Sequence, residues 1–98
     1  MNMREIQKMQ QRLLKMQEEL EASQFTGTAG GGAVTITMNG KFEISAVKID
    51  PEAFSAEDIA ELEVMVLAAA KDAHDRVNAA QQKLANNVTG GMKIPGLF

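Results

Sequence analysis

The sequence predicts an α+β domain in which a helix precedes, and a longer helix follows, a three-stranded antiparallel sheet. Two features lead to this prediction. Apolar residues recur at intervals of three and four near both ends of the chain, which is the spacing of one helix face. Between these regions lies an alternating apolar and polar stretch interrupted by Asn39-Gly40, a dipeptide typical of a β-hairpin turn. A chain of 98 residues has the length of one domain.

The first helix is predicted to span residues 2–22. Its apolar seam is narrow, as in a coiled coil, and consists of Ile6, Met9, Leu13, Met16 and Leu20. At about 100° per residue, four basic residues fall within an arc of about 80°, centred about 125° around the helix from the seam. They are Arg4, Lys8, Arg12 and Lys15. This helix should therefore present one apolar edge and one cationic edge.

The glycine-rich stretch over residues 26–32 could in principle bind a phosphate. No Lys-Ser or Lys-Thr follows it, and the Gly-x-Gly-x-x-Gly spacing is not met. An alternating strand pattern follows it instead, so no helix N-terminus is available to hold an anion. We interpret the three consecutive glycines as a turn between strands at residues 24–28 and 33–38.

The third strand is predicted at residues 42–49. A two-residue loop after Met38 would bring Lys41 and Glu43 onto the apolar face, so we expect a three-residue loop over residues 39–41. The expected pairs are Met38 with Phe42, Ile36 with Ile44, and Val34 with Ala46. Beyond these pairs the alternation of apolar and polar residues shifts by one residue, so that Val47 and Ile49 are the apolar ones. Either a β-bulge or burial of both faces by a second subunit would explain that shift.

Asp50-Pro51 ends the sheet, and the second helix is predicted at residues 56–88. Ser55 can cap this helix, with Asp58 at the capping-box position. About 30 residues give a helix of about 45 Å, which is longer than a domain of this size is wide. Its far end should project or lie on another chain. Gly90-Gly91 end the helix, and an extended tail over residues 89–98 is expected.

Nothing in the sequence favours an enzyme, a cofactor or a metal site. The single histidine, His74, lies one and two residues from Asp75 and Asp72, and such neighbours on a helix point in different directions. The absence of cysteine excludes disulfides and is compatible with a reducing cytosol. The longest apolar run, residues 64–70, is far shorter than the roughly 20 residues of a membrane span. We therefore expect a cytoplasmic protein with no membrane partner.

The net charge of −3 conceals an uneven distribution. Residues 1–16 hold four basic side chains and one acidic side chain, whereas residues 50–63 hold six carboxylates. Trp and Tyr are absent, so there is no aromatic platform for single-stranded nucleic acid. Any nucleic-acid binding should use duplex phosphates, with little sequence preference. The alternative is a protein-interaction module whose narrow seams and seven methionines dock onto another protein's helix.

Three segments, taken together, resemble the YbaB/EbfC family of small bacterial nucleoid-associated proteins. They are GTAGGGAVTITMNGKFEISAVKIDPEAF, LAAAKDAHDRV and TGGMKIPGLF, and the resemblance covers essentially the whole chain. It implies an αβββα subunit and a tweezer-like homodimer whose long helices project from a central sheet. It also implies binding of double-stranded DNA at the nucleoid and a role in nucleoid organisation or gene regulation. The family's gene commonly lies beside a recombination-mediator gene, which suggests recombination or repair proteins as partners.

The residues and the resemblance together predict phosphate contacts on both helices. The expected DNA-binding residues are Arg4, Lys8, Arg12 and Lys15 on the first helix, assisted by Arg76 and Lys83 on the second. A two-fold dimer would present two copies of the cationic edge. The six carboxylates of residues 50–63 should lie away from the DNA, because like charges repel.

Overall fold

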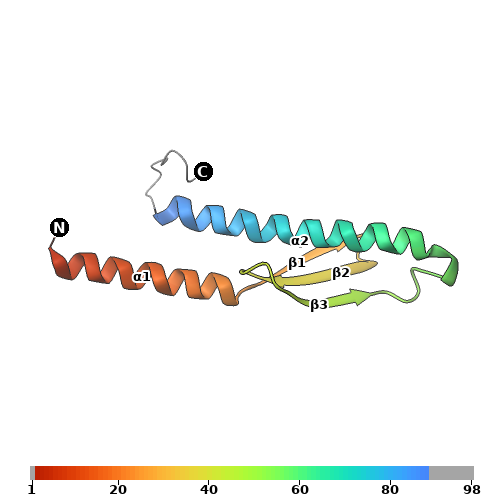
Figure 1. Cartoon of the computed structure of the whole chain (residues 1–98), viewed down its shortest axis with the longest axis horizontal. Helices are drawn as coiled ribbons and strands as arrows, with labels where there is room; N and C mark the ends of the chain where they lie inside the picture. Colours follow the sequence, from red (N-terminus) through yellow and green to blue (C-terminus); the bar gives the residue numbers. More distant parts are fainter. Residues whose placement is uncertain (1, 89–98) are drawn as a thin grey trace.

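The computed structural model describes residues 2–88 and shows an elongated molecule of 66 × 25 × 17 Å (Figure 1). The strands form one antiparallel sheet in the order β1-β2-β3, and α2 lies along one face of it. This confirms the predicted α+β class. The predicted tail, residues 89–98, lies outside the described residues. The elements are α1 (Met3–Ala22), β1 (Gln24–Ala29), β2 (Val34–Asn39), β3 (Ile44–Ile49), the 3-10 helix η1 (Ala56–Asp58) and α2 (Ile59–Val88).

Helix α1 is an arm that is anchored at its C-terminal end. Asn2 caps its start, because the side-chain oxygen accepts the Glu5 N–H at 2.9 Å. The helix contacts α2 and the end of β2, and it contains no fully buried residue. Its first turns extend away from the sheet and beyond the end of α2 (Figure 1). Packing therefore fixes the last turns of α1 much more firmly than the first.

The two halves of the apolar seam of α1 differ in how far they are buried. Leu13, Met16 and Leu20 are half-buried, whereas Ile6 and Met9 remain 43% and 49% exposed. The coiled-coil spacing is thus used against α2 only in the C-terminal half of the helix. The N-terminal half of the seam has no partner among residues 2–88.

The three consecutive glycines form the turn between β1 and β2, as predicted. Gly30, Gly31 and Gly32 have φ angles of 63°, 66° and 96°, which only glycine adopts without strain. The Ala33 N–H closes the turn by donating to the Gly30 carbonyl at 3.3 Å. A strand follows directly, so the loop does not lead into a helix.

The predicted register between β2 and β3 is wrong. Met38 pairs with Ile44 rather than Phe42, and β3 begins two residues later than expected. A bulge at Ser45 then shifts the pairing, so that Ile36 lies opposite Val47. The expected pairs Ile36 with Ile44 and Val34 with Ala46 do not form; Val34 pairs with Ile49 instead. The bulge therefore lies before Ala46 and explains the phase shift in the sequence.

The cause of the new register is the side chain of Asn39. Its Oδ1 accepts the N–H groups of Lys41 at 2.8 Å and Glu43 at 3.1 Å, which stabilises a longer turn than the one predicted. The Asn39 N–H closes the turn on the Glu43 carbonyl at 2.9 Å. Phe42 takes a left-handed φ of 64° and leaves the sheet, and its ring lies 4.6 Å from the ring of His74.

The core lies between α2 and the strands β1 and β2. Val34 and Ile36 on β2 and Val77 on α2 are 0–1% exposed. Gly27 on β1 permits the close packing, because a Cβ at this position would overlap the α2 backbone at Ala69 and Ala73. The helix covers only β1 and β2, which leaves β3 as an uncovered edge strand beside it.

The helical region begins at η1, one residue after Ser55. The Ser55 N–H and hydroxyl both donate to the Asp58 carboxylate, at 2.8 and 3.0 Å. These bonds, the one from the N–H foremost, lower the pKa of Asp58. The predicted capping pair therefore fixes the start of this region.

Candidate nucleic-acid interface

Four exposed cations follow one edge of α1. We call Arg4, Lys8, Arg12 and Lys15 the basic stripe; helix geometry sets it about 125° from the seam that packs on α2. Eleven residues of rise carry the stripe over about 16 Å. Among residues 2–88, none of the four takes part in an ion pair or a side-chain hydrogen bond. Their charge is therefore available to a ligand.

Lys83 is the cation of α2 that lies beside α1. It borders a hollow of about 280 Å³ between the two helices, together with Met16 and Glu19 of α1. Arg12 and Lys15 each precede one of these two residues by one helical turn and so share their side of α1. The structure therefore brings Lys83 to the C-terminal end of the basic stripe, with Glu19 between them as an opposing charge.

Arg76 differs from the other predicted contacts. Its Nε lies 3.4 Å from the Asp72 carboxylate, one turn earlier on α2. That carboxylate also accepts the Thr28 N–H of β1 at 3.0 Å. The bond from Thr28 is the main cause of a lowered pKa at Asp72, with a smaller contribution from Arg76. Arg76 thus helps to join α2 to the edge of the sheet, and its charge is already partnered.

The carboxylates of residues 50–63 and the basic stripe lie at opposite ends of the molecule (Figure 1). The carboxylates of residues 50–63 belong to the segment after β3 and to the start of α2, at the end remote from the start of α1 (Figure 1). Three further carboxylates, Glu18, Glu19 and Glu21, lie at the anchored end of α1. The start of α1 is therefore the most cationic part of the described chain, despite the negative net charge.

The geometry around His74 offers no catalytic arrangement. Its Nδ1 lies 4.0 Å from the Asp75 carboxylate, both side chains are more than half exposed, and its ring contacts Phe42. Over residues 2–88 there is no group of three or more His, Asp or Glu side chains that could hold a metal ion. The described helices also include none with the length and apolar character needed to cross a membrane.

The sequence reasoning missed an apolar surface on β3. Ile44, Val47 and Ile49 lie opposite the core residues of β2 and so belong to the same face of the sheet, but they are 55%, 53% and 39% exposed. The signal was present in the sequence as the phase shift at Val47 and Ile49. The correct register makes all three positions one continuous apolar strip.

Comparison with known proteins agrees with this architecture. The profile of the YbaB/EbfC DNA-binding family matches residues 1–92. A nucleoid-associated protein of Pelotomaculum thermopropionicum is 44% identical over 96 residues, covering 98% of this chain and 91% of that protein. One of Clostridium novyi is 41% identical over 99 residues, covering 98% and 84%.

A solved structure supports the fold. The crystal structure of an uncharacterized protein from Helicobacter pylori superposes with a TM-score of 0.72 at 22% identity, covering 91% of this chain and 98% of that one. The family itself follows from the profile that matches residues 1–92 and from the relatives in Pelotomaculum and Clostridium. This chain belongs to the YbaB/EbfC DNA-binding family.

Proposed function

We propose that the chain binds double-stranded DNA as a homodimer, with the basic stripe and Lys83 in contact with backbone phosphates. The observation that carries this proposal is the row of four exposed cations along α1, without acidic partners among residues 2–88. Lysine and arginine on phosphates supply most sequence-independent DNA affinity. Of the six expected DNA-binding residues, Arg76 should contribute least, because its guanidinium already forms an ion pair with Asp72.

The dimer contact is proposed on the apolar strip of β3. An edge strand that exposes Ile44, Val47 and Ile49 beside a covered sheet is a surface that a second copy could bury. Two copies would double the number of basic stripes and hold them at a fixed separation. No catalytic step or cofactor is part of this function.

In the cell we place this activity at the nucleoid, within the bacterial cytoplasm. The relatives in Pelotomaculum and Clostridium are named nucleoid-associated proteins, which supports the location. Contacts to phosphates alone would coat or organise DNA with little sequence preference. Nucleoid organisation, gene regulation or repair would follow from that binding, with recombination or repair proteins as further partners.

The test is a salt titration of binding to unrelated duplexes. If about four to eight phosphates are neutralised per dimer, the slope of log K against log salt should be about −4 to −7. Lys8→Glu should reduce the magnitude of the slope by about 2, because each of two copies loses a contact worth about 0.9. Lys71→Glu is the matched control, since it makes the same charge change on an exposed helical position outside the stripe.

Two outcomes would overturn the electrostatic proposal. One is a slope near zero for the wild-type protein, and the other is an equal loss of affinity in both variants. Absence of any gel shift at micromolar protein would favour the alternative, a module that docks onto another protein's helix through the exposed half of the α1 seam.

The dimer is tested separately by sedimentation. Val47→Asp adds a charge to the apolar strip at a side chain that is already 53% exposed, so the monomer should fold and dimerisation should fail. Ala46→Asp adds the same charge on the opposite face of the same strand and should leave the dimer intact. A dimeric Val47→Asp protein would exclude this strip as the interface.

A further inference from the structure

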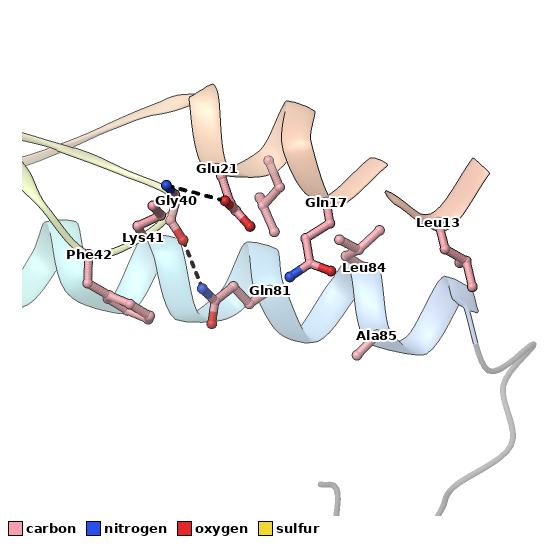
Figure 2. Close-up of a pocket in the computed structure, with 10 residues that line it drawn as sticks. Leu13, Gln17, Glu21, Gly40, Lys41, Phe42, Gln81, Leu84 and Ala85 are labelled. Atoms are coloured by element: carbon pink, nitrogen blue, oxygen red, sulfur yellow. Dashed lines mark hydrogen bonds and ion pairs between the residues drawn. The ribbon is translucent and has the colours of Figure 1, made fainter. Parts of the chain in front are cut away.

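A cavity of about 570 Å³ opens between α1, α2 and the turn after β2 (Figure 2). At its sheet end, backbone and side-chain hydrogen bonds close it. The Gly40 N–H donates to the Glu21 carbonyl at 3.2 Å, and Gln81 Nε2 donates to the Gly40 carbonyl at 2.8 Å. Lys41 and Glu21 form an ion pair of 3.7 Å at the rim. The polar groups at this end are therefore satisfied.

The remaining walls are mostly apolar and incompletely covered. Leu13 and Leu20 come from α1, and Leu84 and Ala85 come from α2; all four are half-buried. Figure 2 shows Gln17 of α1 reaching toward Leu84 across the space between the helices. An apolar occupant here would remove leucine surface from water on both helices at once. It would also add contacts to α1, a helix that has no fully buried residue of its own.

We propose that the occupant is the segment that follows α2, residues 92–98 of the same chain. This segment reads MKIPGLF and combines four large apolar side chains with one charge, Lys93. Segments that remain solvated have low hydrophobicity and high charge, and this composition is the opposite. At the rim of the cavity, Lys93 would share Glu21, a 33% exposed carboxylate, with Lys41, which already pairs with it.

The residues that follow α2 are numerous enough to reach the cavity. Helix α2 ends at Val88, one turn beyond Leu84, and Gln81 lies about 10 Å back along the helix axis. Ten further residues can extend over about 33 Å. Gly90-Gly91 precede the apolar residues and allow the chain to reverse direction. A tether this short keeps the segment near the cavity at about millimolar effective concentration. Seated between the helices, the segment braces the arm that carries the basic stripe.

The chain contains no cysteine, so paired cysteines report directly on this contact. Gln17→Cys with Leu97→Cys places one thiol in the cavity wall and one in the segment. Ala79→Cys with Leu97→Cys is the matched control. Ala79 is exposed, lies within reach of the segment, and by helix geometry points away from the cavity. Under mild oxidation of the full-length protein, the first pair should form an intramolecular disulfide at least about tenfold faster than the control pair.

Equal rates for the two pairs would overturn the proposal, because a segment with no seat samples both positions alike. A disulfide between chains, seen as a band of doubled mass on a non-reducing gel, would assign the cavity to a second copy's segment and would also overturn it. An independent measurement uses Leu97→Cys alone with a nitroxide label. The methyl signals of Leu13, Leu20 and Leu84 should broaden, and those of the exposed Leu67 should not. Neither measurement involves DNA, so their outcome is separate from that of the proposed function.

Discussion

Replacing Gly27 with alanine should destabilise the protein by about 3 kcal/mol, although it adds a single methyl group. The new Cβ would overlap the carbonyl oxygen of Ala69 and the amide of Ala73, and would lie 2.8 Å from the Ala73 Cα. These are backbone atoms of α2, so no side-chain rotation can relieve the overlap. Overpacking that side chains can absorb costs about 1–3 kcal/mol, and a backbone clash should reach the upper end of this range.

The loss of stability in Gly27→Ala should arise from the core residues around the new methyl group. To admit the methyl, α2 must move away from β1 by about 1 Å, because the overlapping backbone atoms lie well inside the 3.4 Å at which ordinary contacts begin. Val34, Ile36 and Val77 pack between the helix and the sheet, and a gap of 0.5–1 Å forfeits about a quarter to a half of each dispersion contact across it. The three side chains therefore lose packing together.

Gly31→Ala is the control, because it makes the same chemical change for a different physical reason. A Cβ at Gly31 meets nothing within 4 Å, and the only cost is the left-handed φ of 66°, about 1–2 kcal/mol. Urea unfolding of both variants at one protein concentration should give a lower midpoint for Gly27→Ala than for Gly31→Ala. An equal or smaller loss at Gly27 would refute the argument that α2 rests directly on this residue.

Two further predictions concern polar groups. Asn39→Ala should lower the free energy of unfolding by about 1–2 kcal/mol, because its Oδ1 holds the N–H groups of Lys41 and Glu43; an unchanged urea midpoint would contradict this role. Asp72 has a folded-state pKa below its ordinary value of 3.8, so its stabilisation is present above that pH and lost as the pH falls through the folded pKa. The stability difference between wild type and Asp72→Asn should therefore shrink on acidification below pH 3.8, and a constant difference would show that the Thr28 bond does not favour the ionised carboxylate.

The basic stripe could be predicted from the sequence because its geometry is local. Arg4, Lys8, Arg12 and Lys15 share an edge of α1 wherever that helix lies, since the helical period alone determines which residues face together. The state of Arg76 could not be predicted in the same way. The sequence shows that Asp72 lies one helical turn before Arg76. It does not show that Asp72 also accepts the Thr28 N–H, because these two residues are 44 positions apart.

Local chemistry by itself determined the elements: the caps at Asn2 and Ser55, the glycine turn and the two helical seams all depend on residues within a few positions of one another. Only the tertiary structure decided the register of β3, the uncovered strip at Val47, and the cavity between the helices. The bonds that the Asn39 side chain accepts are local and lengthen the turn, but the pairs that follow depend on how β3 meets β2 and on where the bulge inserts a residue. A period-two pattern shows which residues can share a face, but it does not show where a turn ends or where a bulge inserts an extra residue.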